Sequence, residues 1–140
     1  MNQFIIREIQ PLTDSDQVIT LWKAVFNYDA PHNQPELSLK KKLAMNDGLL
    51  FVASDGNRVI GTVMAGYDGH RGWIYSVAVY PENRKNGIGR ALMEYAEAAL
   101  RKSGCVKINL QIRENNKEVV RFYEKLGYTI DPIISMGKVL

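Results

Sequence analysis

The chain has 140 residues, of which 46% are hydrophobic and 24% are charged, and its formal net charge is +3. A chain of this length and composition fits one compact domain, residues 1–140, which can bury a hydrophobic core without the help of disulfides or metal ions. A single cysteine excludes an internal disulfide, and the small charge excess, with no basic stripe, argues against a nucleic-acid binder.

The N-terminal part of the sequence predicts a strand followed by a helix. Residues 4–9 are apolar and β-branched, and Pro11 ends this strand. Apolar residues then recur at helical spacing to about Asn27. Thr13 and Asp16 form a start signal that resembles a capping box with a shorter acid.

A second helix and a β-hairpin are expected next. Pro35 is well placed to open the helix and Gly48 to end it. Residues 49–54 and 58–66 read as two strands. The three residues between them, Asp55-Gly56-Asn57, tolerate positive φ and are typical of a hairpin turn.

The second half of the sequence alternates strands and helices. A glycine-rich loop over residues 67–72 leads into it. We predict a strand over 73–79, a helix over 87–102, a strand over 106–112, a helix from Asn115 or Asn116 to Gly127, and two strands over 128–134 and 135–140.

The predicted order is β-α-α-β-β-β-α-β-α-β-β, which indicates the α/β class, with a mixed α+β sheet that has helices on both faces. The unit over residues 73–112 should place two neighbouring strands parallel, joined by a right-handed crossover. The sequence shows no linker, repeat or low-complexity segment.

The segment 77–92 is the most informative part of the sequence. A β-branched run ends at Pro81, and a basic turn with Gly87 and Gly89 precedes an amphipathic helix. Glycines let a ligand approach the backbone, the first helical turn has N–H groups without intrahelical partners, and the helix dipole adds positive potential. We therefore expect this turn to hold a diphosphate. Full positive charges stand nearby on Arg84, Lys85 and Arg90.

The spacing of these glycines separates the turn from better-known phosphate loops. It lacks Gly-x-x-x-x-Gly-Lys-Ser/Thr, which disfavours a nucleotide triphosphatase, and it lacks the full Gly-x-Gly-x-x-Gly of a dinucleotide site. From the glycines alone, a plain strand–turn–helix connection with a solvated basic turn is an equal alternative.

A second segment adds to this pattern. Residues 84–89 fit Arg/Gln-x-x-Gly-x-Gly/Ala, and residues 116–128 fit Asn-x-x-(apolar)-x-x-x-Tyr-x-x-x-Gly-(aromatic), at the correct separation along the chain. In both motifs and in element order the chain resembles the GNAT superfamily of N-acetyltransferases, in particular its small stand-alone bacterial members that are similar to ribosomal-protein N-acetyltransferases. The superfamily's usual alanine in the second motif is Val119 here.

The resemblance implies an activity and a set of site residues. The activity is transfer of acetyl from acetyl-CoA, the co-substrate, to a primary amine by direct attack. The pantetheine arm would lie between strands 73–79 and 106–112, and a backbone amide near Val79 could receive the developing negative charge. The implied catalytic residue is Tyr123, as the acid for the leaving thiolate. The implied cofactor-binding residues are Val77, Val79, Arg84, Lys85, Asn86, Gly87, Ile88, Gly89, Arg90 and Asn116.

The sequence is also consistent with purely structural roles for two of these residues. Asn116 is equally suited to cap a helix, and Tyr123 to pack on the inner face of one. A non-catalytic acetyl-CoA-binding sensor on the same fold is the alternative function, because the central strand carries no carboxylate. The Lys40-Lys41-Lys42 run is read as a solvated helix face.

No general base stands out. Glu82 is read as solvated, Asp68 and His70 as loop residues, and a water relay is an alternative. Residues that could wall the acceptor site, with packing as their usual role, are Trp22, Phe26, Tyr28 and His32, together with the segment 29–35 and the loop 67–72.

The acceptor is expected to be a small-molecule or protein amine. We expect no metal, because no group of residues has metal-ligand spacing, and neither a nucleic acid nor a membrane as partner. The N-terminal residues do not resemble a signal peptide, so a cytoplasmic location is expected. A homodimer is possible if the apolar strand over residues 133–140 pairs at an exposed edge.

Overall fold

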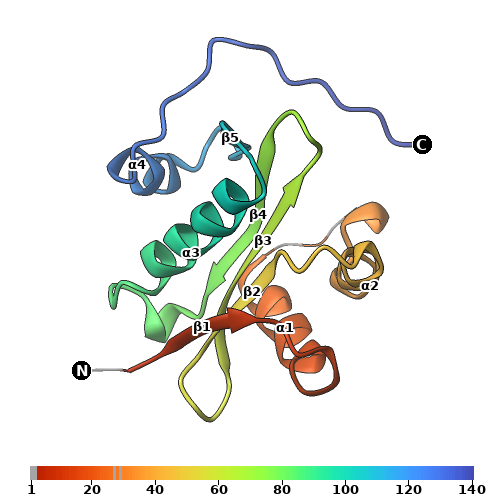
Figure 1. Ribbon diagram of the computed structural model, residues 1–140, viewed down its shortest axis with the longest axis vertical. Helices are drawn as coiled ribbons and strands as arrows, with labels where there is room; N and C mark the ends of the chain where they lie inside the picture. Colours follow the sequence, from red (N-terminus) through yellow and green to blue (C-terminus); the bar gives the residue numbers. More distant parts are fainter. Residues whose placement is uncertain (1–2, 27, 29) are drawn as a thin grey trace. The chain divides into compact units, whose positions relative to one another are not determined.

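A five-stranded mixed sheet forms the centre of the first of two units in the chain (Figure 1). The computed structural model describes residues 3–26, 28 and 30–140. The first unit, Met1–Leu110, holds β1 (Ile5–Glu8), α1 (Pro11–Val25), η1 (Pro31–Asn33), α2 (Pro35–Met45), β2 (Leu50–Ser54), β3 (Val59–Tyr67), β4 (Gly72–Val79), η2 (Pro81–Asn83), α3 (Ile88–Lys102) and β5 (Ile108–Leu110). The second unit, Gln111–Leu140, holds α4 (Lys117–Lys125).

The strands lie in the order β1-β2-β3-β4-β5, antiparallel except for the parallel pair β4–β5. The predicted α/β class, the mixed sheet and the parallel pair are therefore confirmed. All five residues of β2 are buried, as expected of a central strand covered on both faces. The β2–β3 turn is the predicted hairpin, in which the Asp55 carboxylate accepts from the N–H groups of Asn57 and Arg58, each at 2.9 Å.

Helices α1 and α3 cover opposite faces of the sheet (Figure 1). Two neighbouring residues of β3 show this, because successive side chains point to opposite faces. Thr62 contacts Trp22 of α1. A Cβ built on Gly61 would lie 3.1 Å from Leu92 Cδ1 of α3 and 3.0 Å from the Ala78 carbonyl oxygen, so a glycine is needed for the close packing of α3.

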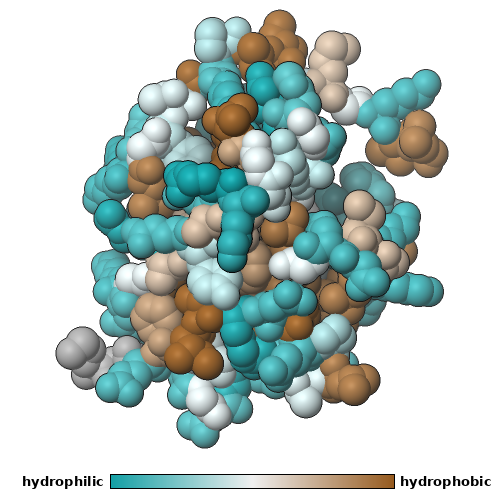
Figure 2. Space-filling model, in the orientation of Figure 1, coloured by the Kyte–Doolittle hydropathy of each residue, from teal (hydrophilic) through white to brown (hydrophobic). Residues whose placement is uncertain are grey.

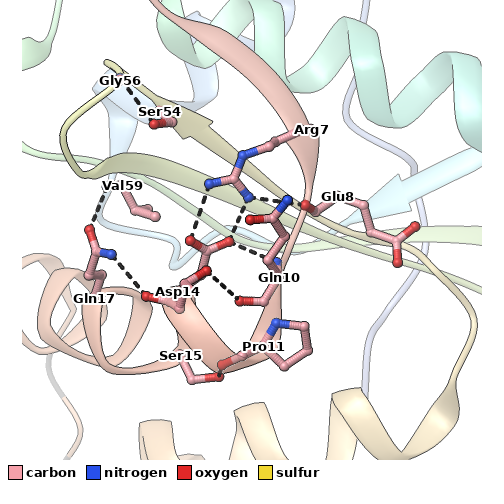
Figure 3. Close-up of polar contacts among 11 residues, drawn as sticks. Arg7, Glu8, Gln10, Pro11, Asp14, Ser15, Gln17, Ser54, Gly56 and Val59 are labelled. Atoms are coloured by element: carbon pink, nitrogen blue, oxygen red, sulfur yellow. Dashed lines mark hydrogen bonds and ion pairs between the residues drawn. The ribbon is translucent and has the colours of Figure 1, made fainter.

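The start of α1 differs from the prediction. The helix begins at Pro11, whose missing N–H is harmless at the first helical position, and not at Thr13. The buried Asp14 carboxylate accepts from the Gln10 backbone N–H at 2.7 Å and from Arg7 of β1 at 2.6 Å (Figure 3). A part-buried ion pair between strand and helix therefore replaces the expected capping box.

The end of α2 also differs from the prediction. The helix starts at Pro35 as expected, and the left-handed residue that ends it is Asn46 (φ 54°) rather than Gly48. The expected end of the first helix, Asn27, lies outside the described residues.

The predicted C-terminal strands are absent, and the predicted strand 106–112 is reduced to β5. Residues 128–140 form neither helix nor strand, and their large apolar side chains are exposed. A strand needs a hydrogen-bonded neighbour, and no described strand pairs with this segment. The prediction of these two strands is therefore wrong, and the homodimer that was expected from them stays a prediction.

Hydrophobic and hydrophilic residues alternate over the face shown in Figure 2. Exposed large apolar side chains are common in soluble and associating proteins alike, so they define no site by themselves. Among the described helices, none combines the length and the apolar content that crossing a bilayer requires.

Candidate active site

A β-bulge interrupts β4 in the middle of the sheet. Thr62 pairs with Ala78 and Met64 pairs with Tyr75, so that two residues of β4 oppose one residue of β3. Ser76, inside the bulge, has φ 50°, a left-handed conformation that is strained for a residue with a side chain by about 1–2 kcal/mol. Strain of this kind persists only where the surrounding structure holds it.

Beyond the first residues of β4, the edge that faces β5 is open. Gly72, Trp73 and Ile74 pair with β5, and no described strand pairs with this edge from Tyr75 to Val79. The Tyr80 N–H donates to Ile60 O of β3 at 3.2 Å, so by alternation the N–H of Val79 points to the open edge. The structure therefore confirms the expected separation of these two strands and leaves the Val77 carbonyl and the Val79 N–H directed to the open edge, where they can pair with an amide.

The turn that follows β4 carries two residues in the left-handed region, Lys85 (φ 66°) and Gly87 (φ 78°). Gly87 is the N-cap of α3, and no side chain caps the helix. The first hydrogen bond of the helix runs from the Ala91 N–H to Gly87 O at 3.0 Å. The three N–H groups before it, Ile88 to Arg90, have no acceptor among the described residues, which suits an anion.

The side chains of this turn divide into anchors and exposed charges. Ile88 is 1% exposed, so only its backbone can contact a ligand. Arg84 is exposed and donates from Nε to Val79 O at 3.1 Å, which ties the turn to the end of β4. Arg90 is exposed and pairs with Glu94 at 2.8 Å. Lys85 and Asn86 are exposed, and Asn86 Nδ2 donates to Asn83 O at 3.3 Å.

In the second unit, Asn116 and Tyr123 belong to α4. Asn116 is the N-cap of the helix, and its side chain accepts from the Val119 N–H at 3.4 Å, as the capping alternative predicted. Tyr123 is 8% exposed and meets Phe122 and Tyr128 edge to face, with ring centroids 5.0 and 5.7 Å away. Burial raises the pKa of Tyr123 to about 12, so the phenol keeps its proton at neutral pH.

Residues 15–128 match the family model for the acetyltransferase (GNAT) family. The chain belongs to the GNAT family. It is an acetyl-CoA-dependent N-acetyltransferase, as the superfamily resemblance implied, and the sensor alternative is set aside.

Solved structures show the same fold. Ard1 from Thermoplasma volcanium is 25% identical, with a TM-score of 0.79 over 91% of this chain and 84% of that chain. The PaiA N-acetyltransferase from Thermoplasma acidophilum, solved with coenzyme A, is 17% identical, with a TM-score of 0.79 over 94% and 93% of the two chains. The ribosomal-protein-S18-alanine N-acetyltransferase from Escherichia coli is 22% identical, with a TM-score of 0.71 over 89% and 77%.

The residues of this GNAT chain fit the diphosphate of acetyl-CoA. A Cβ on Gly87 would meet nothing within 4 Å, so the turn is open at the point where a ligand would approach it. The free N–H groups of the first turn of α3 and the exposed cations Arg84 and Lys85 are the donors that a diphosphate requires. These features belong to one continuous stretch of the first unit.

The structure disfavours the carboxylates that were considered as bases. Asp68 accepts from the N–H groups of Arg71 and His70, each at 2.7 Å, and these bonds hold its pKa below the usual value. The Glu82 carboxylate accepts from its own backbone N–H and from Arg58. These two bonds, the backbone one first, lower the pKa of Glu82. Both groups are therefore turn and surface carboxylates that bind a proton weakly.

Only some of the residues that were expected to line the acceptor site are accessible. Trp22 is 0% exposed and is core, so it cannot line the site. Phe26 and Tyr28 are half-buried against the same core and contact each other edge to face, with centroids 6.2 Å apart. His32 is exposed on η1. Asp29, the start of the expected segment, lies outside the described residues.

Sequence reasoning missed Thr62 and the bulge at Ser76. The one signal was a threonine inside the apolar run of β3, because a hydroxyl buried in a strand needs partners. In the part of the chain that the structure describes, no three His, Cys, Asp or Glu side chains gather as a metal site.

Proposed function

We propose that the enzyme acetylates a primary amine by direct attack of the amine at the open edge of β4. The observation that carries this proposal is the continuity of that edge with the N-terminus of α3, through Arg84 and Gly87. Bound acetyl-CoA would supply an acetyl thioester. The side chains and amides of this chain bind and orient the reacting groups, and water accepts the proton of the acceptor.

The first unit holds and orients the co-substrate in this proposal. The Val77 carbonyl and the Val79 N–H pair with the amides of the arm. The diphosphate lies on the turn, contacted by Arg84, Lys85, Asn86, Gly87, Ile88, Gly89 and Arg90. An amide at the open edge donates to the oxygen on which negative charge develops, which is the most effective single contribution in acyl transfer.

From the superfamily resemblance, we assign Asn116 to the cofactor arm and Tyr123 to the leaving thiolate. Asn116 has its amide N–H₂ to offer a ligand while its oxygen caps α4. With a pKa of about 12, well above the value near 8.5 of an alkyl thiol, the Tyr123 phenol donates a hydrogen bond to the thiolate more readily than it gives up its proton. Water accepts the proton that the ammonium form of the acceptor loses before the neutral amine attacks.

The acceptor is proposed to be a small-molecule or protein amine, and the enzyme to act in the cytoplasm as one functional domain of residues 1–140. The E. coli structural neighbour is named for a ribosomal-protein alanine, and another, from Arabidopsis thaliana, for glucosamine 6-phosphate. Both names describe primary amines of quite different size.

An acceptor screen tests the proposal. Purified enzyme and acetyl-CoA are incubated with small amines, lysine peptides and N-terminal peptides, and released thiol is measured. We expect thiol release above hydrolysis with at least one primary amine and none with its N-acetylated form. Binding of CoA without transfer to any amine would contradict the proposal.

A further inference from the structure

Two buried hydrogen bonds join α1 to the bulge of β4. Trp22 Nε1 lies 2.8 Å from Thr62 Oγ1, which lies 2.9 Å from Ser76 O. Trp22 and Thr62 are both 0% exposed. An indole N–H can only donate, so the Thr62 oxygen accepts from it, and the single hydroxyl proton goes to the Ser76 carbonyl. The direction of both bonds is therefore fixed.

These bonds determine the orientation of one peptide group. The Ser76–Val77 peptide is trans, so its carbonyl and its N–H point in opposite directions. The carbonyl points to Thr62 of β3. The Val77 N–H therefore points away from β3 and from the face that α1 covers, which leaves it on the open side of β4.

The orientation has to be held, because Ser76 is in a left-handed conformation. A serine relaxes from φ 50° toward ordinary strand values unless its neighbours prevent this. Thr62 Oγ1 is the described group that bonds to the Ser76 carbonyl, and Trp22 sets the direction of that hydroxyl. The bulge thus depends on residues 14 and 54 positions away in the sequence.

We propose that Thr62, oriented by Trp22, is a positioning residue for acetyl transfer: it fixes the Val77 N–H at the open edge of β4 as the donor to the thioester oxygen. This inference rests on the proposed function, since it assigns a residue to the amide that receives negative charge. Neither Thr62 nor Trp22 contacts the substrate, and both act through the peptide that they hold.

Four variants test the role of the hydroxyl. Thr62→Val keeps the shape and removes the hydroxyl, Thr62→Ser keeps the hydroxyl, and Trp22→Phe removes only the indole donor. Val59→Ala, at a core position of β3 that is 2% exposed, is the control for lost stability. Each is measured for kcat, CoA affinity and Tm, and for the ¹³C shift of the Ser76 carbonyl, which responds to its hydrogen bond.

We expect Thr62→Val to lower kcat at least about tenfold, because misdirecting a preorganised donor is costly to the rate. CoA affinity should change by less than about threefold, since the diphosphate turn is intact. Thr62→Ser should restore kcat and the carbonyl shift, Trp22→Phe should lie between, and Val59→Ala should keep both despite a lower Tm. If Thr62→Val does not fold, the comparison of kcat and of the carbonyl shift between Trp22→Phe and Val59→Ala decides whether the hydroxyl holds the peptide.

Two results would overturn the inference. One is a Ser76 carbonyl shift that does not move in Thr62→Val or Trp22→Phe. The other is a kcat that follows Tm alike in the Thr62, Trp22 and Val59 variants. A wild-type enzyme that fails to acetylate any amine would instead refute the proposed function, and the carbonyl shift would still decide whether Thr62 holds the peptide.

Discussion

The packing of Tyr123 and its proposed role in the reaction are compatible in one side chain. Its ring packs edge to face with two neighbours in the second unit, and the same burial keeps the phenol protonated. A protonated phenol is what a leaving thiolate needs. The packing alternative raised by the sequence is therefore compatible with the chemical role.

Replacing Tyr123 by Phe should lower kcat at least about tenfold, because the hydrogen bond to the leaving thiolate is lost. The ring packing and the CoA affinity should barely change. Steady-state kinetics and calorimetric titration with CoA measure the two quantities. Tyr95→Phe, on the exposed side of α3, is the matched control. If kcat is equal in the Tyr123 and Tyr95 variants, the phenol of Tyr123 has no part in the reaction.

The ion pair between the buried Asp14 and the partly exposed Arg7 predicts how stability depends on pH (Figure 3). Burial opposes ionisation of Asp14, but the hydrogen bonds from Arg7 and from the Gln10 amide outweigh it and lower the pKa of Asp14. A lowered pKa stabilises the folded state above the unfolded value, near 3.9, and that stability is lost as pH falls through the lower folded value.

Asp14→Asn should therefore cost about 1.5–3 kcal/mol at pH 7, as expected for a charged hydrogen bond, and less in strong acid. Urea unfolding at a series of pH values measures both. Glu82→Gln removes an exposed pair with Arg58 and should change stability by less than about 1 kcal/mol. Parallel pH profiles for Asp14→Asn and the wild type would contradict this assignment.

At the scale of an element, the turn before α3 has a testable conformation. Gly87 and Gly56 both have positive φ (78° and 96°), and an added Cβ at either would meet nothing within 4 Å. Alanine at either position should therefore destabilise the protein by about 1–2 kcal/mol through backbone strain alone. Only Gly87→Ala should also weaken CoA binding, by at least about fivefold, because only that turn faces the diphosphate.

Thermal unfolding and CoA titration of the Gly87→Ala and Gly56→Ala variants separate strain from binding. An equal CoA affinity in both variants would show that the conformation at Gly87 serves the fold and not the ligand.

The elements that the sequence predicted correctly are those set by local pattern. The amphipathic spacing of α3, the Asp55-Gly56-Asn57 turn and the β-branched run of β4 each carry their own signal within a few residues. The turn before α3 belongs to this group, because its glycines and the helix start lie together in the chain.

The features that the sequence did not reveal depend on distant partners. Ser76 adopts a left-handed conformation, and its carbonyl accepts from Thr62, which accepts from Trp22; no local pattern marks this arrangement. Asp14 replaces the expected cap because Arg7 reaches it from β1. The apolar C-terminal residues suggested strands, but apolar content alone does not provide a neighbouring strand to pair with.

For the whole molecule, a ligand bound at the open edge of β4 and the turn before α3 should stabilise the folded state, because both exist only when the chain is folded. A ligand that binds only the folded state adds about 2.7 kcal/mol at a concentration of 100 Kd. For a chain of this size that corresponds to a rise in Tm of roughly 5–15 °C. CoA should therefore raise Tm with increasing concentration, and the rise should shrink at high salt, because the cations of the turn are exposed.

Pantetheine separates the two halves of this binding site in the same experiment. It carries the arm and the thiol of CoA but lacks the diphosphate, so it can pair with the edge of β4 and cannot use the turn before α3. We expect a Tm rise from pantetheine of less than half that from CoA at equal concentration, and one that salt leaves unchanged. Equal shifts from the two ligands would place the binding energy on the strand edge alone and would remove the diphosphate role from residues 84–90.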